Sequence, residues 1–127
     1  MAADKVTWFE LPADNVARAG EFYRQVFGWH TPDTGMSDRS ILAQSAPVGD
    51  DMHPKEKGTI NGGILPRTKT FDRPHIVITV SDLDEKINQV VAAGGSVVQP
   101  RHEVDEVMAF AIIRDTEDNH VGIIQHL

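Results

Sequence analysis

The chain has 127 residues, 40% of them hydrophobic, no cysteine, and a formal net charge of −7 at pH 7. This length suffices for one domain with a single core, and the lack of cysteine excludes disulfides, thiolate metal sites and a cysteine nucleophile. The 12 lysines and arginines are dispersed and no apolar run is long enough for a leader or a membrane span, so we expect a cytoplasmic protein that binds neither nucleic acid nor membranes.

A strand is predicted over residues 6–11, because its side chains alternate in character. Phe9 and Leu11 would share one face, and Trp8 and Glu10 the other. The strand would end at Pro12, since proline cannot donate a ladder hydrogen bond.

A helix is predicted next, with Asp14 or Asn15 as its N-cap and Gly28 as its stop. Two strands are expected afterwards, over residues 40–44 and 59–65, with a polar loop between them. The apolar residues of the helix recur at helical spacing and predict one buried stripe, made of Val16, Ala19, Phe22, Tyr23, Val26 and Phe27.

The same order restarts with a β-branched strand over residues 75–80. A helix would begin with Ser81 and Asp82, and Asp84, three residues after Ser81, would complete a capping-box-like start. The remaining elements are a buried stripe of Leu83, Ile87, Val90 and Val91, a stop at Gly94 and Gly95, strands over residues 97–99, 108–114 and 120–126, and a turn over residues 115–119.

A constant offset of 67 positions relates the two halves (75 − 8 = 67). It matches a strand residue, a helix cap and a helix stop: Trp8 with His75, Asn15 with Asp82, and Gly28 with Gly95. An internal repeat of this kind predicts a duplicated structural unit. We therefore expect one domain over residues 1–127, with modules over about 6–65 and 75–127.

Several segments together resemble a known family: residues 8–14, Arg18-Ala19, Phe22-Tyr23, residues 26–29, residues 75–82, Gly94-Gly95 and residues 115–119. They are similar to the vicinal oxygen chelate superfamily, which includes glyoxalase I, bleomycin and fosfomycin resistance proteins, methylmalonyl-CoA epimerase and extradiol dioxygenases. The opening and Gly62-Gly63-Ile64 are most similar to a glyoxalase-related branch whose members mostly lack an assigned substrate.

The resemblance implies an α+β fold in which two βαβββ modules form a cupped mixed sheet around a ligand cavity. By the same analogy we expect a homodimer. The sequence departs from the family in the last turn, where Thr116 and Asp118 replace the usual proline and glycine. Aspartate tolerates the left-handed backbone conformation better than most residues, so the turn should persist.

Metal-dependent members of the family carry His or Glu on four strands facing the cup. The matching positions here are Trp8, a residue within 59–65, His75 and Gly122, and residues 59–65 contain no His, Asp or Glu. Only His75 could ligate, and a single imidazole does not hold a catalytic metal. We therefore expect no cofactor, with one alternative, a divalent-metal site rebuilt from Glu10, His75 and His120.

The residues expected to line a ligand site are Trp8, Glu10, His75, Val77, Thr79, Phe110, His120 and Gly122. Glu10 could anchor a cationic ligand or act as a base, and His75 could bind ligand or transfer a proton. Either residue could instead be structural, Glu10 in an ion pair and His75 as a hydrogen-bonded core histidine. His30, His53 and His102 are assigned to loops without a role.

These observations favour a metal-independent small-molecule-binding protein of the glyoxalase-like group. One alternative is a lyase, isomerase or dioxygenase that uses Glu10 and His75, with or without a metal. Another is an antibiotic-binding resistance protein of the bleomycin type. All three fit the expected fold, and a fold does not choose between functions.

Overall fold

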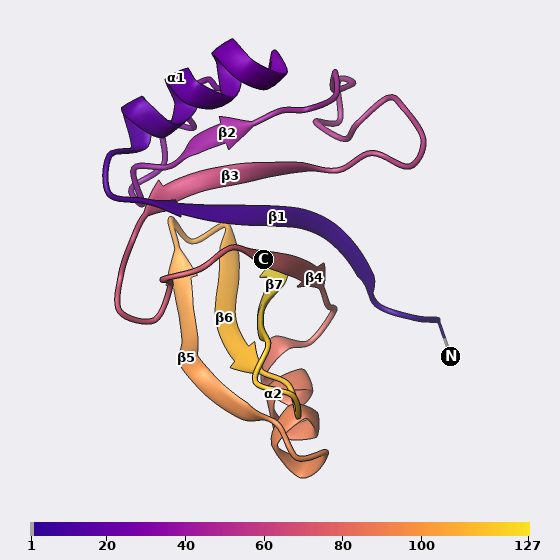
Figure 1. Ribbon diagram of the computed structural model, residues 1–127. Helices are drawn as coiled ribbons and strands as arrows, with labels where there is room; N and C mark the ends of the chain where they lie inside the picture. The colour runs from indigo at the N-terminus through magenta and orange to yellow at the C-terminus, as the bar shows by residue number, and fades with distance from the viewer. Residues whose placement is uncertain (1) are drawn as a thin grey trace.

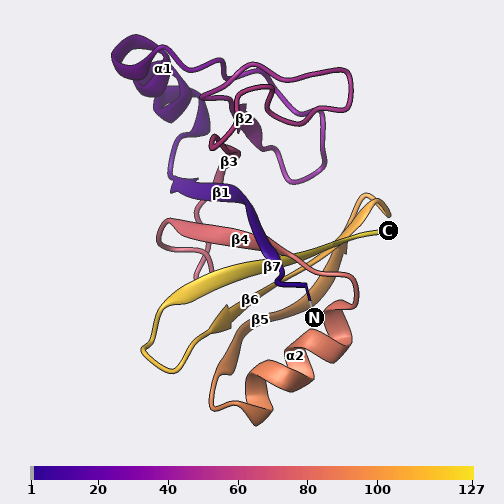
Figure 2. The ribbon, with the colours of Figure 1, turned by 90° about the vertical axis from the view of Figure 1, so that its right-hand side faces the viewer.

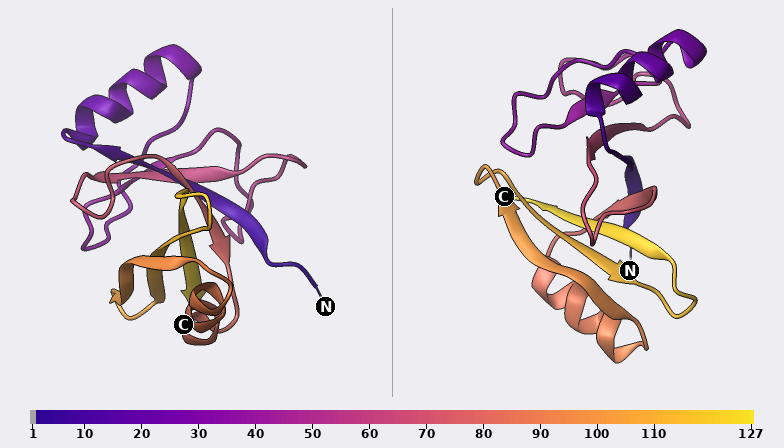
Figure 3. Two further views of the ribbon diagram at one scale, coloured as in Figure 1. Left: turned by 60° about the horizontal axis from the view of Figure 1, so that its bottom comes forward. Right: turned by 60° about the vertical axis from the view of Figure 1, so that its left-hand side comes forward.

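The computed structural model describes residues 2–127 and contains one seven-stranded mixed sheet with a helix on each half (Figure 1). The elements are β1 (Lys5–Ala13), α1 (Val16–Phe27), β2 (Ile41–Ala43), β3 (Asn61–Pro66), β4 (His75–Thr79), α2 (Leu83–Ala92), β5 (Ser96–Val104), β6 (Met108–Arg114) and β7 (His120–His126). The strand order is β2-β3-β1-β4-β7-β6-β5. α1 and α2 lie at opposite ends of the molecule (Figures 2 and 3).

Both halves of the sheet have the same internal arrangement. β1 pairs in parallel with β3, and β4 pairs in parallel with β7. The halves join through the antiparallel pair β1–β4, in which Trp8 lies opposite Val77 and Glu10 opposite His75. The offset of 67 carries Trp8 to His75 and Glu10 to Val77, so an approximate two-fold axis between the central strands exchanges these two pairs. The predicted α+β fold with duplicated modules is confirmed.

The strand predicted over residues 40–44 is β2, and within residues 2–127 the first module has no full strand equivalent to β5. Two isolated bridges, His30–Gln44 and Asp33–Ile41, stand where the second module has β5. Pro32 lies between them and has no N–H to give to a ladder. This half of the sheet is therefore narrower than the other.

β1 extends beyond its predicted end at Pro12 and reaches Ala13. β4 begins at His75, opposite Glu10, so Pro12 lies past the part of β1 that pairs with β4. A proline N–H is not needed there, and Pro12 lies opposite Leu65 of β3 without breaking the strand.

The ends of α1 follow the predicted signals. The side chain of Asn15 accepts a hydrogen bond from the N–H of Arg18 at 2.9 Å. Gly28 ends the helix with a left-handed φ of 73°, a conformation that glycine adopts without strain.

The predicted buried stripe of α1 is wrong at three positions, because Phe22, Val26 and Phe27 are all more than half exposed. The helix approaches the sheet along Gly20, where an added Cβ would lie 2.6 Å from Cδ1 of Ile41. Such a close approach over a narrow sheet covers one side of the helix only. The large apolar residues beside the contact line remain in solvent.

The start of α2 also differs from its prediction. Asp82 is the N-cap and its carboxylate accepts the N–H of Glu85 at 3.1 Å, so the expected box between Ser81 and Asp84 does not form. Val91, expected in the buried stripe, is 54% exposed. The other three residues of the predicted stripe, Leu83, Ile87 and Val90, do pack toward the sheet.

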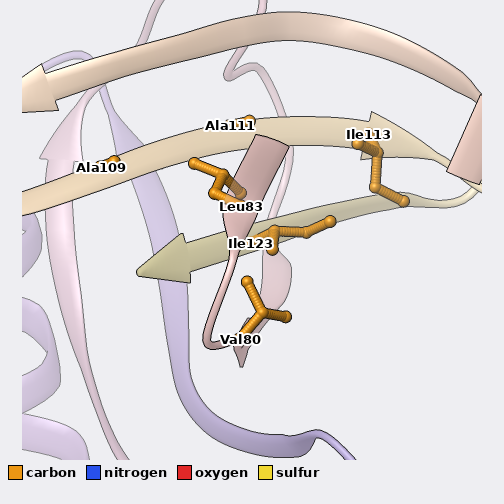
Figure 4. Packing of buried hydrophobic residues seen from close by; sticks show 6 residues of the cluster. All are labelled: Val80, Leu83, Ala109, Ala111, Ile113 and Ile123. Carbon is orange, nitrogen blue, oxygen red and sulfur yellow. The ribbon is translucent and has the colours of Figure 1, made fainter. Parts of the chain in front are cut away.

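Two apolar clusters hold the helices onto the sheet. The larger lies under α2 and combines Val80, Leu83, Ala109, Ala111, Ile113 and Ile123 (Figure 4). The smaller lies under α1 and is centred on Ala13, Ala43 and Ile64. Burial of this apolar surface is the main stabilising contribution to each half.

The turn between β6 and β7 keeps its form despite the substituted glycine position. Asp118 adopts a φ of 66°, as predicted. The Asp115 carboxylate accepts hydrogen bonds from the side-chain amide and the backbone N–H of Asn119 and from the N–H of Glu117, which hold the pKa of Asp115 below its usual value. Within residues 2–127, neither helix is long and apolar enough to cross a bilayer.

Candidate functional site

One face of the sheet is turned away from both helices, and we call it the inner face. Phe9 and Leu11 of β1 pack toward α1, so the alternate residues Trp8 and Glu10 belong to the inner face. The predicted site residues occupy such alternate positions on β1, β4, β6 and β7: Trp8, Glu10, His75, Val77, Thr79, Phe110, His120 and Gly122. The strand register therefore brings them to one face; their roles remain predictions.

A hydrogen bond between Glu10 and His75 lies near the centre of the inner face. The Glu10 Oε1 and His75 Nε2 atoms are 2.9 Å apart. A carboxylate can only accept, so the imidazole donates from Nε2. The Glu10 side chain is 14% exposed and that of His75 only 1% exposed, so solvent reaches the carboxylate rather than the imidazole.

Two aromatic rings and a glycine enclose His75. The rings of Phe71 and Phe110 have centroids 5.0 and 6.1 Å from the imidazole. A Cβ added at Gly122 would lie 3.1 Å from both His75 Nε2 and the Phe110 ring. The bare backbone of Gly122 therefore provides the space that the imidazole occupies. The imidazole is therefore almost completely removed from solvent.

Phe71 was not predicted as a site residue. It lies in the connection between β3 and β4, yet it is buried against His75. Its neighbour Thr70 donates a hydrogen bond to the side chain of Gln99 on β5. This bond attaches the connection between β3 and β4 to that edge strand. A single phenylalanine within the polar segment 66–74 was the available signal.

His102 was also missed, and its assignment to a loop is wrong. β5 continues to Val104, and His102 lies opposite Phe110 with ring centroids 5.7 Å apart. Its Nδ1 lies 3.0 Å from the side-chain nitrogen of Gln99. A register shift between Gln99 and His102 breaks the two-residue alternation, so pattern analysis ended the strand too early.

The strand register locates the remaining family metal position. Glu10 lies opposite Gly63 in the first module, and Val77 lies opposite Gly122 in the second. Glu10 and Val77 correspond through the offset of 67, so Gly63 and Gly122 are equivalent. The position left undetermined within residues 59–65 is therefore Gly63.

The donors at these positions do not fit a divalent metal. Gly63 and Gly122 have no side chain, and the indole of Trp8 has only an N–H to donate. Each glycine leaves room for a ring, because a Cβ at Gly63 would lie 3.5 Å from Trp8 Nε1. Nowhere in residues 2–127 do three His, Cys, Asp or Glu side chains gather in a metal-binding arrangement. Glu10, His75 and His120 accordingly do not make up a three-donor group in this structure.

His120 lies at one end of the inner face, in a polar environment of its own. Burial lowers its pKa below the usual 6.5, and the positive charges of Arg73 and Arg114 lower it further. Asp72 and Asp118 oppose this effect, and each contacts one of the two arginines. At this end of the inner face, each of the two arginines is therefore paired with an aspartate.

A separate apolar groove of about 450 Å³ opens between the modules. Its main walls are Phe9, Leu11, Ile76 and Val121, which alternate with inner-face residues and so place the groove on the helix-bearing side. Pro74, Asp115 and Asn119 complete its margin, and Glu10, His75 and His120 also line it. The groove therefore shares Glu10, His75 and His120 with the set of predicted site residues.

Comparison with known proteins agrees with this architecture. The glyoxalase-like domain family matches residues 8–124. A glyoxylase-like domain-containing protein of Didymella fabae is 28% identical over 120 residues, which cover 91% of this chain and 88% of that protein.

Solved structures share the fold at low sequence identity. Methylmalonyl-CoA epimerase of Streptomyces coelicolor, in complex with 2-nitronate-propionyl-CoA, matches with a TM-score of 0.65 and 13% identity, covering 98% of this chain and 99% of that one. The hypothetical protein BH1468 of Bacillus halodurans C-125 matches with a TM-score of 0.67 and 12% identity, covering 99% and 96%. These similarities concern the fold alone.

Proposed function

Because this chain belongs to the glyoxalase-like domain family within the vicinal oxygen chelate superfamily, we propose that it binds a small molecule on its inner face without a metal. The observation that carries the proposal is the hydrogen bond between His75 and Glu10. It supplies a polar anchor on a face whose side chains do not fit a metal site.

The surroundings of Glu10 support a role in ligand binding. A charged group that is largely removed from water is unfavourable unless partners compensate it. His75 compensates one carboxylate oxygen, and the 14% exposure of the side chain leaves room for a second partner. Trp8 and Phe110 are half-buried, so their rings offer apolar faces against which a flat ligand can stack.

The other predicted site residues have supporting positions. Val77 is fully buried, so it supports the inner face from below and does not contact the ligand. The hydroxyl of Thr79 lies 2.7 Å from that of Thr7, which engages it within the protein. Ligand contact is therefore proposed for Trp8, Glu10 and Phe110.

Catalysis is the second candidate function, and the same hydrogen bond favours it. A carboxylate held by an imidazole and open to solvent on one side is suited to proton transfer. In this reading Glu10 is the general base of an isomerase or lyase, and His75 is its positioning residue. Nothing in the arrangement singles out an antibiotic as ligand, and a dioxygenase would need the metal that these donors do not fit.

The proposal can be tested by metal analysis and ligand-dependent stability. Protein purified without chelator should contain no stoichiometric divalent ion, and chelator should not lower its unfolding temperature. A flat aromatic ligand at 100 times its Kd should stabilise the fold by about 2.7 kcal/mol. Glu10→Gln should reduce this stabilisation, whereas Glu117→Gln, in the exposed turn, should not. One bound divalent ion per chain, removed together with stability, would overturn the metal-free proposal.

A further inference from the structure

We infer that the ligand is a neutral or cationic aromatic molecule bearing an N–H or O–H donor, and that anionic ligands are rejected. This inference rests on the proposed function and specifies its ligand class. It follows from the hydrogen-bonding state of Glu10 and from the pairing of the arginines around the sheet.

Glu10 presents an acceptor to the ligand. Its Oε1 accepts from His75, and within residues 2–127 its Oε2 receives no hydrogen bond. An ionised carboxylate has about four acceptor sites and no donor. A group that approaches the open oxygen must therefore bring its own proton, as an amidinium, amine, amide or phenol does.

Two arginines that lie close to the sheet, Arg67 and Arg101, are each paired with an aspartate. Arg101 turns to the α2 side, where it pairs with Asp84 at 2.9 Å. Arg67 pairs with Asp14 at 3.0 Å, in the connection that carries Phe71. These cations are already matched, so an anionic ligand gains little from them.

The charged end of the inner face is balanced in the same way. Arg73 pairs with Asp72 at 2.8 Å, and Arg114 contacts Asp118 and donates to the Ser96 hydroxyl. Lys69 beside Thr70 is exposed, where water and salt screen its charge. The net charge of −7 adds a general repulsion of anions.

Two aromatic side chains of the inner face strengthen the preference for a cation. Trp8 and, through the pairing of β4, β7 and β6, Phe110 lie on the same face as Glu10, and both are half-buried. A cation over an aromatic ring is attracted by the ring quadrupole, most strongly by tryptophan. An anion in the same place is repelled by both the ring face and the carboxylate.

The inference is tested with three probes of nearly equal shape: benzamidinium, benzamide and benzoate. Their affinities are measured at pH 7 by NMR titration, following the indole N–H signal of Trp8, which a Trp29→Phe variant assigns. The expected order is benzamidinium, then benzamide, then benzoate, with at least a tenfold difference between the first and the last.

Glu10→Gln should weaken benzamidinium binding by about tenfold, or 1.4 kcal/mol, and bring the three affinities close together. Glutamine keeps an acceptor for His75, and circular dichroism verifies that the variant is folded. Glu117→Gln is the matched control for charge and should leave the order unchanged. Benzoate binding as tightly as benzamidinium would overturn the inference while leaving the proposed function intact. If none of the probes shifts the Trp8 signal, the proposed function and the inference both fail.

Discussion

Glu10 and His75 are 65 positions apart in the chain and form a 2.9 Å hydrogen bond across the junction of the two modules. The bond forms because β1 and β4 are the central strands, and their antiparallel register places the two residues directly opposite. One module supplies the carboxylate and the other the imidazole. The hydrogen bond therefore depends on the packing of the two modules against each other as well as on the site itself.

Removing the imidazole should destabilise the protein. We expect His75→Ala to lower the free energy of unfolding by about 2 kcal/mol, because Glu10 loses its donor and the enclosed ring leaves a cavity. Urea unfolding measures the loss. The double variant with Glu10→Ala, which removes the acceptor, should lose less than the sum of the two single alanine variants, since the two residues interact directly. Strict additivity would mean that the hydrogen bond contributes nothing in solution.

The ring of Phe71 should both stabilise the fold and shield His75. Phe71→Ala is expected to cost about 3 kcal/mol, at the lower end for a buried phenylalanine because this ring lies in a connecting segment. The imidazole should also react faster with diethyl pyrocarbonate, followed by mass spectrometry. Phe27→Ala is the matched control, because Phe27 is 59% exposed and should change neither readout. An unchanged reaction rate at His75 in Phe71→Ala would show that another group covers the imidazole.

A methyl group at Gly122 should disturb the site more than one at Gly63. The added Cβ at Gly122 would meet His75 Nε2 and two Phe110 atoms at 3.1 Å, and overpacking of this kind costs about 1–3 kcal/mol. At Gly63 the nearest atom is the mobile Cδ1 of Leu65, at 3.3 Å, so Gly63→Ala should be close to neutral. Thermal unfolding of the two variants gives the comparison. Equal costs would argue against close packing around His75.

The protein should become less stable as the pH is lowered, in part because of His120. Its pKa is lowered in the fold, chiefly by burial, so the unfolded chain binds the proton more readily. This contribution is fully present above the ordinary value of about 6.5 and is lost as the pH falls through the lower folded value. Urea midpoints at pH 7.5 and 5.5 should therefore differ less in His120→Asn than in the original protein. His126→Asn, at an exposed position, serves as control and should retain the full difference.

Much of the fold could be predicted because its signals are local. Asn15 and Asp82 each cap a helix through their own side chains, and Gly28 ends one through its own φ. Strand alternation likewise assigns Trp8 and Glu10 to one face without reference to any other strand. These signals, repeated at an offset of 67, were sufficient for the duplicated architecture.

Other features depend on neighbours that are distant in the sequence. The exposure of Phe22 follows from how narrow a sheet α1 meets, and helical spacing carries no information about that width. The place of His102 depends on a register shift against β6, and that of Phe71 on the contacts of its segment with β5.

The candidate site divides in the same way. Its central residues, Glu10 and His75, were predictable by residue type and by face. Their hydrogen bond was not, because it requires β1 and β4 to be paired in one register. Alternation within a strand is a property of the local backbone, whereas the register between strands is set by the packing of the whole sheet.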